Sequence, residues 1–439
     1  MIKLWEQILS KLKNKEKALV PEEKVTILSN TNPDKINSFN LNYYAKKSEL
    51  CEIGRKYDTD KSSQRDNVTN TRHCHPYTLF YNGLFKEYRN ESLRIAELGI
   101  LDGASLLMWK EYFPKAIIEG FEFNDNYINT FREKNPTVPV HKLDVQNKNG
   151  IISALGDKLY DLIIEDTTHQ FEDQIRVIEN IYVNLKPGGM LIIEDIFKSY
   201  NEQDYLDRLK PVLSHFSDYY FVTLDHDNRN STGWDNDKLF VLIKSGAESI
   251  FKNKNKLTII TPCYRTQNLE KIKDSIDFDY VNEWIIIYDG TKVPSNFIFF
   301  NEPKITEHVF SGTGISGNPQ RNLALDSIRH SEALLYFLDD DNIMHPALFK
   351  FLNICESDTI YTFDQTGRLL GNNISIGYID TACLLIDYSL CKDIRWDPSR
   401  YDADGQYIMD CYRNNQSKYC YINTNLCYYN KLASDTPSS

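Results

Sequence analysis

Three consecutive carboxylates follow a short apolar segment in the second half of the chain. The run Leu335–Asn342 reads LYFLDDDN, so a buried strand would end directly at Asp339, Asp340 and Asp341. Adjacent like charges repel one another and lose hydration at such a place, and a divalent cation relieves that repulsion. The natural partner of such a cation is a diphosphate. The run predicts a metal-assisted enzyme that uses a nucleotide-sugar, although an Asp-rich turn after a strand is also a common structural feature.

Two acidic pairs end apolar segments in the first half of the chain. Both segments read LIIED, and they end at Asp166 and at Asp195. Asp166, Glu194 and Asp195 could converge on one divalent ion. His169 lies three residues after Asp166 and could act as a general base on a hydroxyl held by that ion. The alternative is that both pairs only cap the helices that follow.

A pair of glycines precedes these acids. The segment 96–106 reads AELGILDGASL, in which Gly99 and Gly103 allow a ligand to approach the backbone at a helix N-terminus. Glu122 ends the next expected strand, where an acidic residue suits a ribose diol. A glycine pair in a strand–helix turn is a weak signal, so an empty Rossmann-like domain is the alternative.

The apolar segments themselves predict an α/β fold with two doubly wound domains. Strand-like and helix-like segments alternate, a pattern typical of parallel sheets with helices on both faces. In both halves the polar residues lie at the carboxyl ends of strands, where open α/β sheets bind ligands. The expected strands span 93–98, 116–122, 159–165, 189–194 and 239–243 in the first series and 257–261, 284–288 and 334–338 in the second.

A charged segment, KNKNK at 252–256, separates the two series of strands and marks the expected domain boundary. We expect an N-terminal helix and linker over 1–50, a first domain over 51–250 and a second domain over 256–433. The residues from 434 onward are expected to form a frayed tail.

Net charge, cysteine spacing and the length of apolar runs argue against several classes of protein. The 439 residues carry a net charge of -12, which argues against a nucleic-acid partner. The nine cysteines are scattered and include no C-x-x-C pair, which predicts a reduced, cytoplasmic chain. No apolar run approaches the ~18 residues of a membrane span, and the N-terminus lacks a signal peptide. The segment 1–19 is expected to form an amphipathic helix docked on the protein itself, with peripheral contact to the inner face of the membrane as the alternative.

The second half resembles GT-A glycosyltransferases, and in particular the inverting glucuronyltransferases that build proteoglycan linkers. The resemblance covers 257–432 and rests on four blocks in register: ITPCYR at 260–265, WIIIYD at 284–289, PQRNLALD at 319–326 and YFLDDDN at 336–342. It implies that Asp289 binds the uracil or ribose and that Arg321 contacts the nucleotide-sugar. It further implies that Asp339 and Asp340 lie toward the ribose, and that Asp341 coordinates Mn²⁺ or Mg²⁺.

The same resemblance implies a base and a residue that recognises the donor sugar. Asp404 aligns best with the carboxylate that deprotonates the acceptor, with Asp402 as the alternative, and Asp380 matches the donor-sugar position. The family uses a Glu as the base. The chain also lacks the family's C-terminal His, and Lys431 or a tyrosine hydroxyl could take its place on the diphosphate.

The first half resembles the metal-dependent sugar O-methyltransferases of macrolide biosynthesis, which are related to the cephalosporin hydroxylase group. The resemblance covers about 54–245 and rests on YDTDK at 57–61, HPY at 75–77 and LKPGG at 185–189. It implies that S-adenosylmethionine contacts Glu97, Gly99, Glu122 and Asp144, that Mg²⁺ is held by Asp166, Glu194 and Asp195, and that the base is His169. The chain departs from the family at Glu165 and Thr167, where Asp and Gly are usual.

Together these resemblances imply a two-domain enzyme of bacterial capsule or surface glycan assembly. The second half would transfer a sugar with inversion from a UDP-sugar, with UDP-glucuronate as a candidate, to a glycan acceptor. The first half would methylate a hydroxyl of the same glycan. Three alternatives are a glycosyltransferase with a non-catalytic methyltransferase-like scaffold, a methyltransferase with an inert sugar-binding module, and a non-enzymatic assembly factor.

Overall fold

The computed structural model describes residues 38–65, 73–231, 233–251, 255–330 and 333–432. The helix expected over 1–19 and the tail expected from 434 onward lie outside these ranges. Within them, no helix is both long enough and apolar enough to cross a membrane.

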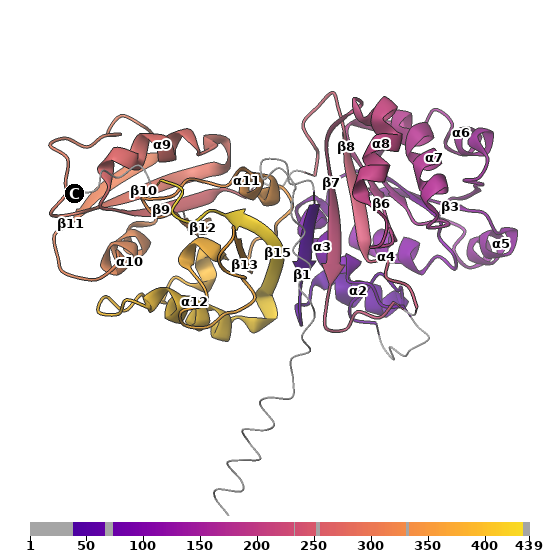
Figure 1. Cartoon of the computed structure of the whole chain (residues 1–439). Helices are drawn as coiled ribbons and strands as arrows, with labels where there is room; N and C mark the ends of the chain where they lie inside the picture. The colour runs from indigo at the N-terminus through magenta and orange to yellow at the C-terminus, as the bar shows by residue number, and fades with distance from the viewer. Residues whose placement is uncertain (1–37, 66–72, 232, 252–254, 331–332, 433–439) are drawn as a thin grey trace, which may run out of the picture. The chain divides into compact units, whose positions relative to one another are not determined.

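The first half of the chain folds as a Rossmann-like α/β layer (Figure 1). Its parallel strands lie in the order β4 (Val140–Lys142), β3 (Ile117–Glu122), β2 (Arg94–Leu98), β5 (Tyr160–Glu165) and β6 (Leu185–Ile193). The strand β8 (Lys238–Lys244) pairs antiparallel with β6 and with β7 (Phe216–Asp225). The expected strands of this half are therefore confirmed, and β4 and β7 are additional.

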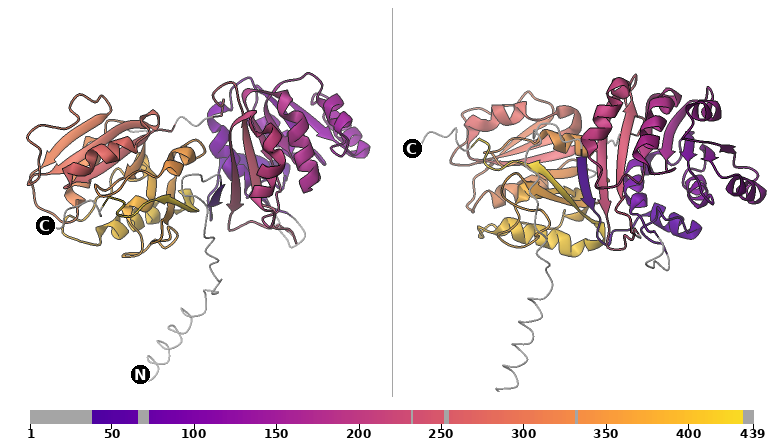
Figure 2. Two further views of the ribbon diagram at one scale, coloured as in Figure 1. Left: turned by 45° about the horizontal axis from the view of Figure 1, so that its top comes forward. Right: turned by 45° about the vertical axis from the view of Figure 1, so that its right-hand side comes forward.

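Helices cover both faces of these strands (Figure 2). On one face, α6 (Lys148–Leu155), α7 (Phe171–Ile181) and α8 (Glu202–Leu213) pack side by side. Apolar residues of α7 and α8, among them Ile178 and Leu209, join strand residues such as Ile163 in one core. The opposite group comprises α2 (Glu49–Tyr57), α3 (Tyr77–Phe85) and α4 (Ala104–Tyr112), whose core is aromatic, as in the edge-on contact of Tyr81 with Trp109 at 5.4 Å.

The second half repeats the alternation of strands and helices. Parallel strands lie in the order β11 (Ile305–Phe310), β10 (Val281–Asp289), β9 (Leu257–Cys263) and β12 (Leu334–Phe337). They continue through β14 (Leu384–Asp387), antiparallel to both neighbours, to β13 (Ile360–Gln365) and β15 (Tyr419–Cys427). The helices α9 (Leu269–Asp274), α10 (Asn318–Ser327), α11 (Pro346–Leu352) and α12 (Ala403–Asn414) accompany them.

The strand β1 (Ser38–Asn42) joins the two series of strands into one sheet of 15 strands. It pairs parallel with β7 and antiparallel with β15. Phe39 and Leu41 point inward and are buried, and the Phe39 ring contacts Tyr220 and Phe351. This corrects the linker expected here, because an alternation of only five residues is hidden among polar neighbours and is stabilised by strands far away in the sequence.

Parallel pairing brings the strand-end acids together. Leu98 lies opposite both Phe121 and Glu165, and Glu165 lies opposite Ile193. The residues that follow these strands therefore emerge at one edge of the sheet, as expected of doubly wound folds. The ends of β9, β10 and β12 are aligned in the same way in the second half.

Candidate functional site

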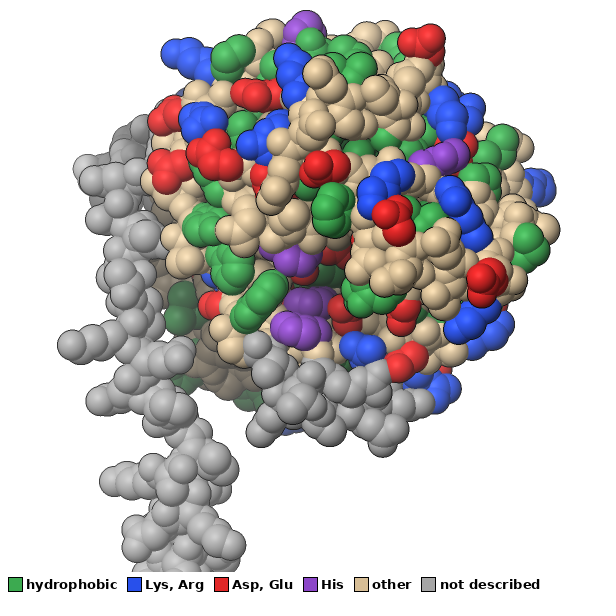
Figure 3. All heavy atoms as spheres, turned by 90° about the vertical axis from the view of Figure 1, so that its right-hand side faces the viewer, with side chains coloured by type: hydrophobic (Ala, Val, Ile, Leu, Met, Phe, Trp, Pro, Cys, Tyr) green, Lys and Arg blue, Asp and Glu red, His purple; other side chains and the backbone are tan. Residues whose placement is uncertain are grey.

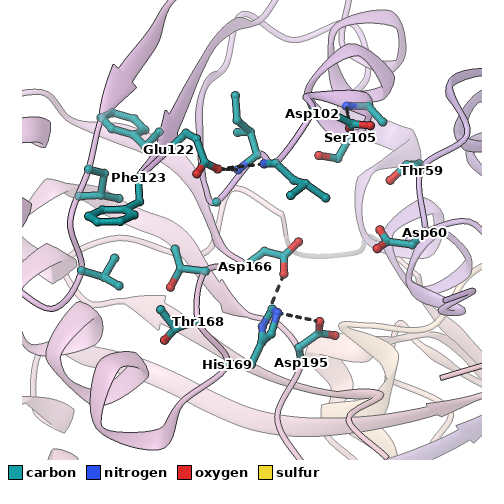
Figure 4. A pocket seen from close by; sticks show the side chains of 18 of the residues that line it. Thr59, Asp60, Asp102, Ser105, Glu122, Phe123, Asp166, Thr168, His169 and Asp195 are labelled. Atoms are coloured by element: carbon teal, nitrogen blue, oxygen red, sulfur yellow. Dashed lines mark hydrogen bonds and ion pairs between the residues drawn. The ribbon is translucent and has the colours of Figure 1, made fainter. Parts of the chain in front are cut away.

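A cavity of about 540 Å³ lies at the carboxyl ends of β2, β3, β5 and β6 (Figure 4). The residues that line it come from the turns after these strands and after β4, from the start of α4 and from the segment after α2. Those that the sequence predicted are Gly99, Glu122, Asp144, Asp166, His169 and Asp195. Gly103, Glu97 and Glu194, which were also predicted, lie outside the lining.

The turn after β2 depends on its two glycines. Gly99 and Gly103 have φ angles of +83° and +85°. A Cβ on Gly99 would lie 1.9 Å from the carbonyl oxygen of Asp166, and one on Gly103 would lie 2.2 Å from the ring of Phe131. The two glycines therefore let this turn press against β5 on one side and α5 (Asp125–Lys134) on the other.

Glu122 ties the end of β3 to the glycine turn. One carboxylate oxygen accepts hydrogen bonds from the backbone N–H groups of Ile100 (3.2 Å) and Leu101 (3.0 Å), and the other accepts from Asn124 (2.8 Å). Asp144 accepts from the backbone of Gln146 at 3.0 Å and faces the same cavity. Both carboxylates keep lone pairs for a ribose hydroxyl or an adenine amine.

Glu97 lies behind the cavity wall and is fully buried. Its carboxylate makes no hydrogen bond of good geometry, but the Ser105 and Trp109 side chains approach it and favour the charged form, and the Nζ atom of Lys61 is 3.8 Å away. Burial raises the pKa of Glu97 to about 7.

Asp166, His169 and Asp195 form the metal-type cluster of the site. Their ligand atoms all lie within 4.8 Å of one another, and no other such group occurs in the part of the chain that the structure describes. His169 lies between the two carboxylates (Figure 4), with Nδ1 3.8 Å from Asp166 and Nε2 3.6 Å from Asp195. His169 and Asp195 both have left-handed backbones, with φ near +57°. Such strain is commonly found at functional sites.

Glu194 does not join this cluster. Its fully buried carboxylate accepts hydrogen bonds from Lys61 and from the hydroxyl of Tyr81. The Lys61 ammonium also binds Asp166. Burial alone would lower the pKa of Lys61, but the surrounding carboxylates raise it well above its usual value. Lys61 is therefore a buried cation. The structure thus gathers His169, rather than Glu194, with the two aspartates.

Three polar residues that support the cluster had no predicted role. Besides Lys61, the Tyr77 hydroxyl donates to Asp195, and the buried His75 ring lies 2.7 Å from Asp237. Burial alone would lower the pKa of His75, but the carboxylates of Asp195 and Asp237 raise it to about 9. The three residues belong to the YDTDK and HPY motifs, so the sequence marked them as a group. The carboxylates that they bind are distant in the sequence and could be identified only from the structure.

A second cavity of about 310 Å³ lies at the carboxyl ends of β9, β10 and β12. Predicted residues that line it are Asp289, Arg321, Asp339, Asp340 and Asp341. Arg321 is buried and donates to Asp339 at 2.6 Å. Burial raises the pKa of Asp339 to about 7 despite this arginine.

Arg265, which had no predicted role, closes one side of the second cavity. Its guanidinium lies 2.5 Å from Asp340 and 3.3 Å from Asp341. Asp340 also accepts from the backbone of Tyr264 and Arg265, so it holds the loop after β9. Asp340 and Asp341 thus share Arg265, whereas Asp339 pairs with Arg321, and among the described residues these three aspartates form no metal-type cluster.

The remaining predicted residues of the second half are not among those that line this cavity. Asp404 is 4.0 Å from Arg321, and burial raises its pKa. Asp402 instead pairs with Arg400 in a two-bond ion pair at the surface. Asp380 pairs with Arg368 at 2.8 Å and caps the turn that follows it.

Comparison with known proteins adds sequence relatives for part of the chain. No family model matches. The chain is 29% identical over 163 residues to demethylmacrocin O-methyltransferase of Streptomyces fradiae, covering 35% of this chain and 38% of that protein. It is 26% identical over 164 residues to mycinamicin VI 2''-O-methyltransferase of Micromonospora griseorubida, covering 36% of this chain and 38% of that protein. About a third of the chain is thus homologous to sugar O-methyltransferases.

Among solved structures, the chain is similar to the MycE methyltransferase of mycinamycin biosynthesis, in a complex with Mg, SAH and mycinamycin VI. The identity is 19% and the TM-score 0.34, over 46% of this chain and 56% of that one. The chain spans less than two-fifths of the length of the curated relatives named above.

Proposed function

We propose that the first half of the chain is an S-adenosylmethionine- and Mg²⁺-dependent O-methyltransferase that acts on a sugar hydroxyl. The observation that carries this proposal is the position of Asp166, His169 and Asp195 at one side of the 540 Å³ cavity, with Glu122 and Asp144 at the other. The homology to sugar O-methyltransferases supports it.

The chain's own groups suit the cofactor. Glu122 and Asp144 offer acceptors for the ribose and adenine. Glu97 remains a predicted contact, but it lies behind the cavity wall and would reach the amino group of the methionyl part only if Ser105, which lines the cavity, moved aside. When bound, S-adenosylmethionine supplies an electrophilic methyl group. The glycine turn brings backbone close to it, because no Cβ stands in the way at Gly99.

The metal-type cluster suits an acceptor hydroxyl. Mg²⁺ prefers oxygen ligands, so we assign Asp166 and Asp195 as its ligands. We assign His169 as the base that removes the proton of the sugar hydroxyl. The imidazole accepts the proton that the sugar oxygen loses, and the flanking carboxylates stabilise the resulting cation. Glu194 remains a predicted ligand that would have to leave Lys61 in order to reach the ion.

The test is transfer of a labelled methyl group from S-adenosylmethionine to simple hexopyranosides by the full chain. His169→Gln should retain binding of S-adenosylhomocysteine but lose at least about a hundredfold in transfer rate, the usual effect of removing a general base. Glu172→Gln, an exposed residue that pairs with Arg208, is the matched control and should behave as the wild type. Unchanged transfer by His169→Gln would refute the assigned base.

For the second half we propose transfer of a sugar from a UDP-sugar, with UDP-glucuronate as the first candidate, to a growing surface glycan. The observation that favours it is the single cavity lined by Asp289, Arg321 and the run Asp339–Asp341. Asp341, with Mn²⁺ or Mg²⁺, would face the diphosphate, and Asp404 would act as the base. The ion pair of Asp402 with Arg400 leaves Asp404 as the better placed of the two.

Binding of UDP in the presence of Mn²⁺ tests this second proposal. Asp341→Asn should weaken binding at least tenfold, because one metal ligand is lost. The control is Asp397→Asn, an exposed turn residue that accepts from Ser399. If the wild-type chain binds neither UDP nor UDP-sugars, the proposal fails.

A further inference from the structure

Trp234 is an exposed tryptophan that stands next to the metal-type cluster. Its side chain is 45% exposed, whereas Trp109, Trp284 and Trp396 are fully buried. Its ring lies edge-on to the His169 ring, with centroids 5.9 Å apart. Exposure alone is common for aromatic residues of this chain, but an aromatic face beside polar ligand-binding groups can gain free energy by covering the apolar face of a ligand.

The segment that bears Trp234 is held in place on both sides. The backbone N–H of Trp234 donates to Ser231, and the carboxylate of Asp235 binds Arg229 (2.6 Å) and Lys198 (2.9 Å). The next two residues, Asn236 and Asp237, are fully buried. The indole is therefore positioned by the fold and is not the tip of a loose loop.

Trp234 belongs to an aromatic wall that we define as His73, Phe197, Trp234 and His169. Trp234 contacts His73 at 5.9 Å and Phe197 at 5.7 Å between ring centroids. The wall continues inward, because His73 stacks on His75, and His75 stacks on Tyr77, which binds Asp195. On this face of the first half, histidine, hydrophobic and acidic side chains meet around a hollow (Figure 3).

A wall of aromatic rings beside carboxylates matches the two kinds of surface that a pyranose presents. The C–H groups on one face of the ring are apolar and stack on aromatic side chains, while the hydroxyls at its edge bind carboxylates or an ion. A sugar stacked on Trp234 would lie beside His169, and its hydroxyls would point toward Asp166 and Asp195.

We infer that Trp234 is the platform on which the acceptor hexopyranose stacks, and that it selects acceptors with one face poor in hydroxyl groups. The inference rests on the proposed methyltransferase function of the first half. It assigns a substrate-binding role to a residue that lies outside the cofactor cavity.

Tryptophan fluorescence tests the inference without any turnover. Trp109, Trp284 and Trp396 are buried, so in a Trp5→Phe background a change in acrylamide quenching reports on Trp234. With Mg²⁺ and S-adenosylhomocysteine present, methyl α-L-rhamnopyranoside should reduce quenching saturably, and sorbitol, an acyclic polyol, should not. Quenching of the Trp5→Phe chain that no hexopyranoside changes would overturn the inference.

Variants separate this inference from the proposed function. Trp234→Ala should raise the KM for the acceptor about tenfold, the effect of losing one aromatic contact, and Trp234→Phe should raise it less. Both should bind S-adenosylhomocysteine as the wild type does, and so should the control Phe300→Ala, an exposed aromatic of the second half. Methyl transfer with an unchanged KM in Trp234→Ala would refute the platform alone. If the chain does not bind S-adenosylhomocysteine, the proposed function fails, and the quenching result still decides whether Trp234 binds a sugar.

Discussion

At the scale of single residues, the buried Lys61 ammonium holds the acidic ends of β5 and β6 together. It binds Asp166 and Glu194 and lies near Glu97, and it is only 2% exposed. Like charges in such a place would otherwise repel one another without water to screen them. The lysine therefore neutralises the site from behind, while the cavity side of Asp166 stays open to a ligand.

Replacing Lys61 with methionine should lower the free energy of unfolding by about 3–5 kcal/mol, because the removal leaves buried carboxylates without a partner. Under the proposed assignment Mg²⁺ would bind Asp166, one of the same carboxylates, and should then restore part of the loss. Urea unfolding with and without Mg²⁺ measures both effects. Lys56→Met, which removes an exposed ion pair with Glu111, is the control, and an equal effect of both variants would contradict this account.

Glu97 makes stability depend on pH. Its pKa is raised by burial to about 7, above the value of 4.5 that it has in water. The folded chain therefore holds this proton more tightly than the unfolded chain, and Glu97 costs stability as the pH rises from about 4.5 to about 7. Glu97→Gln should remove that contribution, so its stability relative to the wild type should increase over this range. Chemical unfolding at several pH values checks the sign, and a constant difference would contradict it.

At the scale of elements, the positions of strands along the chain could be predicted from the sequence where each strand is mostly apolar, but their order in the sheet could not. The parallel strands β2, β5 and β12 are buried on both faces, so their apolar composition alone indicates that they are strands. The strand β1 could not be predicted, because its two inward residues become meaningful only beside β7 and β15.

The strand-end acids could likewise be predicted as a group but not sorted individually. Parallel strands bring their carboxyl ends to one edge, which places Asp166 near Asp195 without further information. That Asp195 faces the cavity while Glu194 turns inward depends on the left-handed backbone at Asp195 and on Lys61, more than 100 residues earlier. Local sequence carries neither fact.

The glycine turn after β2 gives a prediction at this scale. Gly99→Ala should destabilise the chain by on the order of 2–4 kcal/mol, because its Cβ would meet the Asp166 carbonyl and its backbone is left-handed. Gly377→Ala is the matched control, since Gly377 has a φ of +81° but no atom within 4 Å of the added Cβ. Equal losses in thermal unfolding would show that the close approach to β5 does not matter.

At the scale of the described molecule, β1 makes the two halves share one sheet. Side chains reinforce the junction, since Glu356 of the second half binds Lys46 at 2.5 Å and accepts from Asn82 at 2.9 Å. A shared sheet couples the stability of both halves, because unfolding of either half removes the hydrogen bonds that β1 makes to it and exposes the strand edge of the other half.

Phe39→Ala should therefore weaken both halves together, by about 3–5 kcal/mol, because it leaves a cavity between Tyr220 and Phe351. Trp109 reports on the first half, whereas Trp284 and Trp396 report on the second. Single-tryptophan variants followed in urea should show one common transition that moves to lower urea. Two separate transitions in the wild-type chain would contradict the coupling.

The most direct test of the central claim is a calorimetric titration of S-adenosylhomocysteine into the folded, full-length chain with Mg²⁺. The account predicts one molecule bound per chain, with an affinity that UDP does not change, because the two cavities lie at the ends of different strands. No binding by a chain that still unfolds cooperatively would contradict the claim that the first half is a methyltransferase.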